Sequence, residues 1–351
     1  MNGSVPVETL PYRPEELTGA MGPAWKETLV AAYRWMVLGR TLDARMQTLQ
    51  RQGRIGFYGP ATGHEAVNVA AGLVSRPEDW VFPGLREQLV ALVRGLALDA
   101  YAHSLFADDR DTARGRQMPC HPTAREVNYV SMSSVVGTQI SQAVGVAYAL
   151  HVRKAPGAVL AFFGDGATSA NDFHAGLNFA GVFQLPVVFV CANNQWAISV
   201  PAERQTASAT MAGKASAYGL PGRRVDGTDF VAVYRALADA LDGARAGKGP
   251  SLLELVIFRM TPHSSSDDPR RYQPTDWTDR AARVDPVARL ERWMEDHRLL
   301  PPDLRSSVSE GAERLVREAV RVAEQAPAPS PDSLTEDVYA SPPSGGSGRT
   351  G

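Results

Sequence analysis

The sequence predicts an α/β fold with a mostly parallel sheet, helices on both faces and further helices toward the C-terminus. The first observation is that two apolar runs, residues 159–163 and 185–191, flank a helical segment. The second is another apolar run, residues 251–258, that follows an amphipathic pattern over residues 229–245. Apolar runs of this length are typical of buried parallel strands. Strand–helix–strand crossovers bring the carboxyl ends of such strands to one edge of the sheet.

Composition excludes several classes of protein. The chain has 351 residues, of which 44% are hydrophobic and 21% are charged, with a net charge of −2. This balance gives no reason to expect nucleic acid or an anionic membrane as a partner. Cys120 and Cys191 are the only cysteines, which is too few for a disulfide framework or a zinc site. No window is apolar enough to span a membrane, so we expect a soluble, cytoplasmic protein.

The first part of the chain predicts an arm and two helices. Residues 1–22 are rich in Pro, Gly and Glu and predict an extended arm before a main domain at 23–325. Apolar residues recur at helical spacing from Trp25 to Gln50. A glycine-rich loop then leads to a helix of small residues at 65–74.

The remaining elements follow from shorter patterns. Residues 79–82 predict a strand, and Asn171 or Asp172 is expected to cap the helix between the two apolar runs. Residues 205–222 predict a loop, and 286–297 and 309–324 predict two exposed closing helices, the first capped by Asp285. Residues 326–351 form a tail rich in Pro, Ser and Gly that we expect to be partly disordered.

Polar residues follow the two apolar runs of the central unit. Gly164, Asp165 and Gly166 end the first run, and Asn194 follows about 29 positions after Asp165, a normal βαβ length. Ligands bind at this edge of open α/β sheets. One carboxylate and one amide oxygen suit Mg²⁺ that completes its shell with phosphate oxygens and water. The glycines let the backbone approach a phosphate closely.

Other candidate residues have an ordinary structural alternative. Arg86 follows a predicted strand and could reach a phosphate, or it could be a solvated arginine. His263 lies just past the strand 251–258 and could be catalytic, or a solvated loop histidine. His64 could be catalytic or a helix cap, and we favour the helix cap. Ser133, Thr138 and Gln139 offer oxygens for a monovalent cation, but N-capping explains them about equally well.

Several ordered motifs resemble one enzyme family. Gly-Asp-Gly followed by Asn-Asn resembles the thiamine diphosphate motif. RQGRIGFY (51–58), GRQMP (115–119), SSVVGTQISQAVGVAYA (133–149), RVDG (224–227) and HSSSDD (263–268) extend the likeness from about Trp35 to Tyr339. The chain resembles the alpha subunit of the decarboxylating component of 2-oxo acid dehydrogenase complexes, nearest to the branched-chain (2-oxoisovalerate) type. This implies a thiamine diphosphate-binding fold.

The resemblance also implies roles for individual residues. Asp165, Asn194 and the main-chain carbonyl of Trp196 would bind Mg²⁺, and His263 would be the catalytic residue beside the thiazolium ring. Contacts with thiamine diphosphate would come from Arg86, Ser134, Val136, Gly164, Asp165, Gly166, Ala167, Asn194, Arg259 and His263. Ser133, Val135, Thr138 and Gln139 resemble a potassium site. The sequence departs from the family pattern at Gly84-Leu85, Ala192 and Gln195-Trp196, which suggests fewer side-chain charges on the phosphates.

The family activity is oxidative decarboxylation of a 2-oxo acid, with transfer of the acyl group to a lipoyl-bearing acyltransferase. The resemblance implies two alpha and two beta chains, with no activity for the alpha chain alone. Pyruvate or acetoin are alternative substrates, and a non-catalytic scaffold with a thiamine fold is the alternative from another class. A nicotinamide dehydrogenase is disfavoured because no convincing G-x-G-x-x-G follows the first strand.

Overall fold

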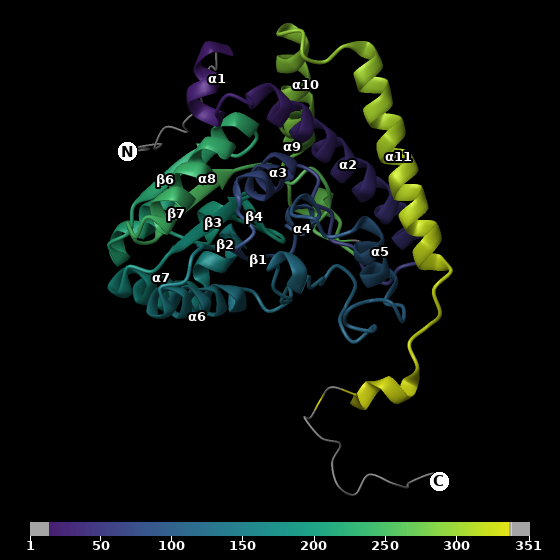
Figure 1. The fold of residues 1–351 in the computed structure, drawn as a ribbon, viewed down its shortest axis with the longest axis horizontal. Coiled ribbons are helices and arrows are strands. Elements are labelled where there is room, and N and C mark those ends of the chain that lie inside the picture. The colour runs from purple at the N-terminus through teal and green to yellow at the C-terminus, as the bar shows by residue number, and fades with distance from the viewer. Residues whose placement is uncertain (1–13, 265, 337, 339–351) are drawn as a thin grey trace, which may run out of the picture.

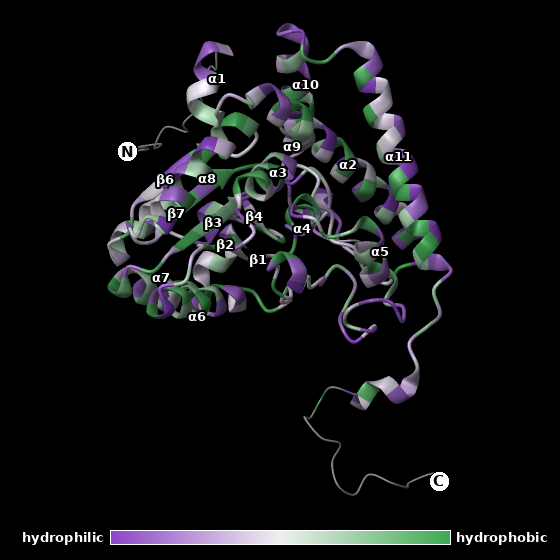
Figure 2. Ribbon diagram, in the orientation of Figure 1, coloured by the Kyte–Doolittle hydropathy of each residue, from purple (hydrophilic) through white to green (hydrophobic). Residues whose placement is uncertain are grey.

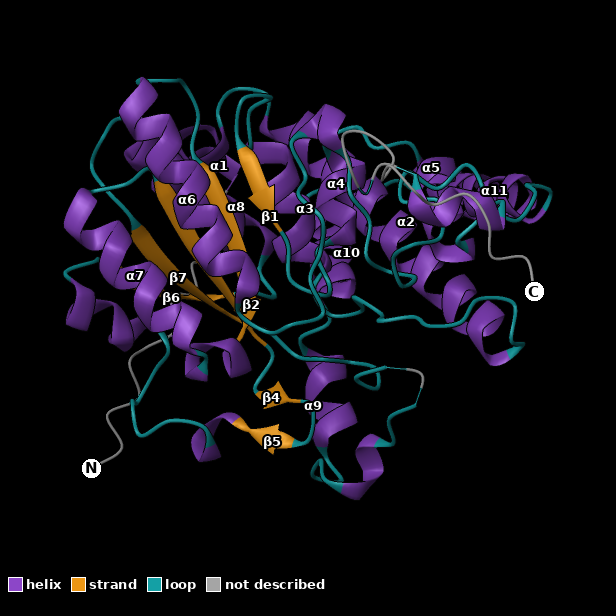
Figure 3. Ribbon diagram, turned by 90° about the horizontal axis from the view of Figure 1, so that it is seen from below, coloured by secondary structure: helices purple, strands orange, loops and turns teal. Residues whose placement is uncertain are grey.

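A five-stranded, fully parallel sheet forms the centre of the molecule. We describe it from a computed structural model, which covers residues 14–264, 266–336 and 338. The strands run in the order β1-β2-β3-β7-β6 and point in the same direction (Figure 3). Their bounds are β1 Trp80–Phe82, β2 Val159–Gly164, β3 Val187–Asn193, β6 Gly222–Asp226 and β7 Ser251–Val256. The predicted fold class is confirmed.

Alternate residues of β2 and β3 enter two different hydrophobic cores. Leu160 and Phe162 of β2 face the core that contains α3 (Glu65–Val74) and α8 (Phe230–Arg245). Val159, Ala161 and Phe163 face the opposite core, which contains α6 (Thr138–Arg153) and α7 (Asn171–Phe183). Figure 1 shows α6 and α7 on one side of the sheet and α3 and α8 on the other. Both faces are therefore covered, which explains the continuous apolar runs of the strands.

The remaining helices extend the first core away from the sheet. They are α2 Trp25–Arg51, α4 Gln88–Val93, α5 Leu98–Phe106, α10 Pro286–Asp296 and α11 Pro302–Glu324. The short helix α9, Trp277–Arg283, instead packs its Trp277 ring against Phe258. The long helix α11 packs along α2 and α5. Hydrophilic and hydrophobic residues are interspersed along it (Figure 2), and its buried side is formed by residues such as Val308, Val316 and Val320. The closing helices are therefore amphipathic.

Short elements connect these helices and strands. A two-stranded hairpin, β4 (Trp196–Ala197) and β5 (Val200–Pro201), follows β3 directly. The 3-10 helices are η1 Arg125–Val127, η2 Asp165–Ser169, η3 Ala202–Arg204, η4 Ala212–Tyr218, η5 Pro269–Arg271 and η6 Pro331–Thr335. Within the described ranges, no helix combines the length and apolar character that crossing a membrane requires.

Four local expectations were wrong. Pro14–Met21 form helix α1 rather than extended chain, because Leu17 is buried in the core; residues 1–13 lie outside the described part. Neither Asn171 nor Asp172 caps α7, whose N-cap residue is Ala170; the Asp172 carboxylate instead accepts from Ser141 Oγ at 2.7 Å. Residues 205–222 contain η4, which packs against β6.

The fourth difference concerns α11, which begins seven positions before the predicted Ser309, at Pro302. Pro at the first helical turn is compatible with a helix start, because its missing N–H would have no partner there. The cap of α10 is confirmed: the Asp285 side chain accepts from the backbone N–H groups of Val287 and Ala288. Asp229 caps α8 in the same way.

Candidate active site

Loops after four neighbouring strands meet at one cavity of about 570 Å³. Arg86 follows β1, Asp165 follows β2, Asn194 follows β3 and His263 follows β7. All four line the cavity, together with the predicted residues Ser133, Ser134, Val136, Gln139, Gly164, Gly166, Ala167 and Trp196. The structure thus brings most of the predicted site residues to the carboxyl edge of the sheet. Val135, Thr138 and Arg259 do not line the cavity.

The pairing of β2 with β3 brings Asp165 and Asn194 to neighbouring turns at the same edge of the sheet. Gly164 is the partner of Ala192 in this register, so each of the two polar residues follows a paired strand end. Asp165 is 1% exposed, and burial raises the pKa of its carboxyl to about 6 although a hydrogen bond from Gln205 opposes the shift. A buried carboxylate with a raised pKa is a group that a cation would stabilise in its charged form.

Asn194 is held in a tight turn. Its side-chain oxygen accepts from the backbone N–H of Trp196 at 3.2 Å, while Trp196 itself lines the cavity from β4. Gly164 has open space where a Cβ would be, and Gly166 packs so closely on Ala197 that a Cβ would lie 2.6 Å from that residue's Cβ. The turn after β2 can therefore approach a ligand with its backbone, as a phosphate requires.

Arg86 and His263 form a contact across the cavity wall. Arg86 is 5% exposed, so the alternative of a solvated arginine is wrong. Its Nη2 donates to the carbonyl of His263 at 2.8 Å and lies 3.2 Å from His263 Nδ1. Because a guanidinium can only donate, Nδ1 is an acceptor and the ring proton is on Nε2. Burial, Arg86 and Arg259 lower the pKa of His263 to about 4, so this imidazole is neutral near pH 7.

The backbone of His263 is also fixed. Its N–H donates to Asp267 Oδ2 at 2.7 Å, and the hydroxyl of Tyr272 donates to the same oxygen at 2.6 Å. The Arg86 Nη1 donates to the carbonyl of Pro60, in the loop before α3. Two loops from distant parts of the chain therefore hold the imidazole and the guanidinium in one orientation.

Arg259 lies behind the cavity wall and is 1% exposed. Its Nη2 donates to the carbonyl of Ile198 at 2.9 Å and to the hydroxyl of Tyr272 at 2.7 Å. Its Nε and Nη1 have no hydrogen-bond partner among the residues that the structure describes. Unpaired buried donors are costly, so these two nitrogens favour an anion nearby.

The loop before α6 carries the residues that resemble a potassium site. Gln139 is buried, its Nε2 donates to the carbonyl of Phe162 at 2.8 Å, and its Oε1 has no partner within the described chain. Ser133 Oγ accepts from the backbone N–H of Val135 at 3.2 Å. The side chain of Thr138 does not cap α6, whose N-cap residue is Gly137 at φ 94°. The N-capping alternative is therefore wrong for this helix.

Some residues of the cavity were missed or underrated. His64 occupies the N-cap position of α3 but makes no capping hydrogen bond; its buried side chain lines the cavity instead. Burial and the charges of Arg86 and Arg259 hold the pKa of His64 well below its usual value. Phe57 of RQGRIGFY and Glu87 also line the cavity, and burial raises the pKa of Glu87 to about 7. A glycine-rich loop before a helix was the only sequence signal for His64.

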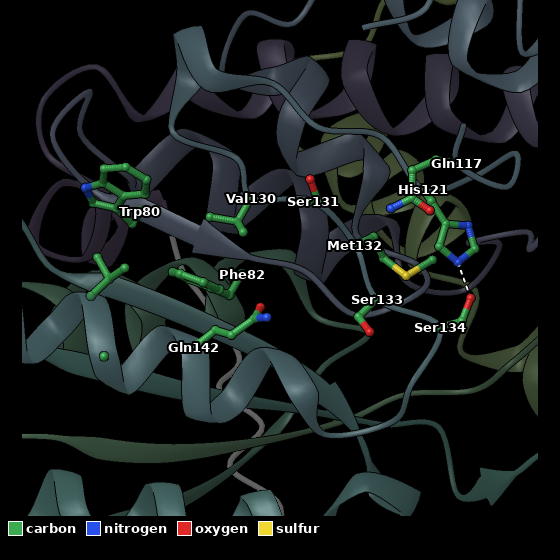
Figure 4. A pocket seen from close by; sticks show the side chains of 12 residues that line it. Trp80, Phe82, Gln117, His121, Val130, Ser131, Met132, Ser133, Ser134 and Gln142 are labelled. Carbon is green, nitrogen blue, oxygen red and sulfur yellow. Dashed lines mark hydrogen bonds between the residues drawn. The ribbon is translucent and has the colours of Figure 1, made fainter. Parts of the chain in front are cut away.

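A second hollow, of about 730 Å³, adjoins the first (Figure 4). His121, Met132, Ser133 and Ser134 line both. His121 Nε2 is hydrogen-bonded to Ser134 Oγ, and Figure 4 shows this pair at one end of the hollow, with Trp80 at the other. The wall between the two spaces is therefore formed by the loop before α6 and by His121.

The residues present fit Mg²⁺ and a diphosphate. Asp165 and Asn194 offer the oxygen ligands that this ion prefers, and the turn at Gly164 offers backbone. The described residues contain no cluster of three His, Cys, Asp or Glu side chains that could hold a metal alone. A divalent cation here would therefore need further oxygen ligands, which a diphosphate supplies. The unpaired nitrogens of Arg259 would offset the negative charge of the diphosphate.

The chain is similar to known proteins over most of its length. A family model described as "Dehydrogenase E1 component" matches residues 33–332. The 3-methyl-2-oxobutanoate dehydrogenase subunit alpha of Mycobacterium tuberculosis is 40% identical over 315 residues, which are 90% of this chain and 83% of the relative. The 2-oxoisovalerate dehydrogenase subunit alpha of Bacillus subtilis is 38% identical over 89% of this chain and 95% of its own. The pyruvate dehydrogenase E1 component subunit alpha of Staphylococcus aureus is also 38% identical, over 89% of this chain and 82% of its own.

Proposed function

Because the chain belongs to the alpha subunits of the dehydrogenase E1 component family and is a thiamine diphosphate-dependent oxidoreductase subunit, we propose that it acts in the oxidative decarboxylation of branched-chain 2-oxo acids. The acyl group would pass to a lipoyl-bearing acyltransferase. The observation that carries this proposal is the meeting of Arg86, Asp165, Asn194 and His263 at one cavity.

Each residue would have a separate task. Asp165, Asn194 and the Trp196 carbonyl would bind Mg²⁺, with backbone N–H groups of Gly166 and Ala167 on the diphosphate. Arg86 and Arg259 would offset its negative charge, and Ser134 and Val136 would contact the cofactor from the opposite wall. When bound, thiamine diphosphate supplies the nucleophilic carbon and the electron sink; the protein supplies position and electrostatics.

His263 would act on the substrate as a neutral imidazole. Its Nδ1 is occupied by Arg86, so Nε2–H is the group available to donate a hydrogen bond. The lowered pKa means that the ring holds no second proton near pH 7. It would therefore steady developing negative charge on a substrate oxygen by hydrogen-bond donation from Nε2–H.

The loop of Ser133, Val135, Thr138 and Gln139 would bind K⁺ and hold the neighbouring Ser134 and Val136 in place. The unpartnered Oε1 of Gln139 supports this part of the proposal. Backbone carbonyls of the same loop would complete the shell.

Two features support a branched-chain substrate. Phe57, in the motif RQGRIGFY, lines the cavity with further apolar residues such as Leu85 and Met132, which suits an aliphatic side chain. The relatives from Mycobacterium tuberculosis and Bacillus subtilis are named for 3-methyl-2-oxobutanoate and 2-oxoisovalerate. Pyruvate is the second candidate, because the Staphylococcus aureus relative is equally similar to this chain as the Bacillus subtilis one.

The partners would be a beta subunit, in an assembly of two alpha and two beta chains, and the acyltransferase. A cytoplasmic location stays a prediction, since a similar chain from Arabidopsis thaliana is named as mitochondrial. A scaffold without catalysis is disfavoured by the presence of Asp165, Asn194 and His263 in one site.

The test is decarboxylation by this chain co-expressed with a beta subunit, in the presence of thiamine diphosphate and Mg²⁺. We expect turnover of 2-oxoisovalerate at a higher kcat/KM than pyruvate. A higher kcat/KM for pyruvate would support the proposed reaction but reject a branched-chain 2-oxo acid as the substrate. A stable complex with no turnover of either acid would favour the scaffold.

A further inference from the structure

The carboxylate of Asp165 is held from outside the cavity by one side chain. Gln205 Nε2 donates to Asp165 Oδ2 at 2.7 Å and makes a longer contact, 3.3 Å, with the carbonyl of Val200. Gln205 does not line the cavity. Because Oδ2 accepts this hydrogen bond, Oδ1 is the oxygen of Asp165 that is more open to a ligand in the cavity.

The hairpin after β3 brings Gln205 to this position. The chain leaves Asn194, forms β4 and β5, and returns through η3, with the backbone N–H of Ala202 bound to the carbonyl of Gln195 at 3.1 Å. The backbone N–H of Gln205 donates to the carbonyl of Ala202 at 3.1 Å. One short segment therefore carries both amides that stand beside Asp165, the Asn194 amide in the cavity and the Gln205 amide behind it.

The fit around the side chain of Gln205 leaves it little freedom. Its Oε1 lies 3.5 Å from where a Cβ on Gly166 would be, so the amide packs over the glycine turn itself. A donor in this place fixes the rotation of the carboxylate.

We propose that Gln205 is a positioning residue, whose amide holds Asp165 in the orientation that binds a divalent cation against a diphosphate. This inference rests on the proposed function, because it assigns Gln205 a part in that same cation site. Groups that orient metal ligands in this way typically contribute roughly 10- to 100-fold to metal affinity.

The test uses the complex with the beta subunit and measures the apparent Kd for Mg²⁺ at fixed thiamine diphosphate by calorimetry. For Gln205→Met, which keeps the bulk and removes the donor, we expect the Kd to rise roughly 10- to 100-fold. Turnover should return to within about twofold of wild type at saturating Mg²⁺, because the residue does not touch the reacting atoms. Gln205→Asn is the second variant, for use if Gln205→Met fails to fold. It keeps the amide but is one methylene too short to reach Asp165, so its Kd for Mg²⁺ should rise in the same way.

Gln184→Met is the matched control, because its amide donates to the carbonyl of Gly181 at the end of α7, away from the cavity. It should leave the Mg²⁺ affinity unchanged. An unchanged Kd for Mg²⁺ in both Gln205 variants would overturn the inference, and so would turnover that stays low at saturating Mg²⁺. Neither result would affect the proposed function, provided that the wild-type complex binds thiamine diphosphate with Mg²⁺. Absence of Mg²⁺-dependent cofactor binding in the wild-type complex would instead reject the proposed function.

Discussion

Arg86 and His263, which are 177 positions apart in the chain, lie with Nη2 and Nδ1 3.2 Å from each other. The guanidinium sets the tautomer of the imidazole because it can only donate. Its charge also favours the neutral ring. This contact between the loops after β1 and β7 thus determines that Nε2, and not Nδ1, is the protonated nitrogen of His263.

Replacing Arg86 by Gln should raise the pKa of His263 from about 4 toward its usual 6.5, because one of two nearby positive charges is lost. The measurement is a pH titration by NMR on protein labelled in its histidine rings, with the signal of His263 assigned by its loss in His263→Asn. Arg292→Gln, an exposed arginine, is the control. A pKa that remains near 4 would show that burial and Arg259 set the shift without Arg86.

His263 should also affect the stability of the fold in acid. The pKa of His263 is lower in the folded chain than in the unfolded one, so the unfolded state binds the extra proton between about pH 6.5 and 4. The contribution of a neutral His263 is therefore complete above pH 6.5 and is lost as the pH falls toward 4. Urea unfolding measures the free energy of unfolding across this pH range, and this free energy should fall less for His263→Asn than for wild type. An equal dependence on pH in the two proteins would contradict the assignment.

Asp43 should stabilise the loop before α3. It is buried, and its carboxylate accepts from the Tyr58 hydroxyl at 2.6 Å and the Thr62 hydroxyl at 2.7 Å. Asp43→Asn replaces one acceptor oxygen by a donor, so the free energy of unfolding should fall by about 1–3 kcal/mol at pH 7. Urea unfolding measures this. Asp239→Asn, on the exposed side of α8, should change it by less than about 0.5 kcal/mol, and an equal loss in both would reject the role of Asp43.

Gly63 and Gly53 allow a matched comparison. Both have positive φ, 98° and 72°, but a Cβ on Gly63 would lie 2.0 Å from the carbonyl oxygen of Phe258, whereas nothing lies within 4 Å at Gly53. Gly53→Ala should cost only the strain of the backbone, on the order of 1 kcal/mol. Gly63→Ala should also separate the loop of His64 from the end of β7 and abolish cofactor binding. Similar melting temperatures for the two variants would contradict this.

The chain alone should not turn over 2-oxo acids, because the family resemblance places the glutamate that activates the pyrimidine on the beta subunit. Glu87, the glutamate that lines the cavity of this chain, instead accepts from the backbone N–H of Arg86 at 3.2 Å. A steady-state assay of the purified chain with thiamine diphosphate and Mg²⁺ measures this directly. Turnover that rises with added beta subunit from a zero baseline is the expected result. Turnover without any partner would contradict this prediction and would give the role of the missing glutamate to a carboxylate of this chain, such as Glu87.

The sequence predicts which residues gather at the carboxyl edge of the sheet, but it does not predict the side-chain contacts behind them. Asp165 and Asn194 follow apolar runs, and parallel strands bring such ends together, so their proximity follows from the sequence pattern. Gln205 reaches Asp165 only because β4 and β5 form a hairpin of two residues each, which the sequence does not signal. Arg259 also follows a strand, but tertiary contacts turn it toward Tyr272. Periodicity predicts which residues end a strand, not where a long side chain points.

The most direct test of the site is binding of thiamine diphosphate, with and without Mg²⁺, to the complex that carries Asp165→Ala. Asp239→Ala serves as the control, because this exposed carboxylate does not line the cavity. The account predicts that the wild type and the control bind the cofactor only with Mg²⁺, and that Asp165→Ala does not bind it at either condition. Unchanged Mg²⁺-dependent affinity in Asp165→Ala would contradict the assignment of the cation site.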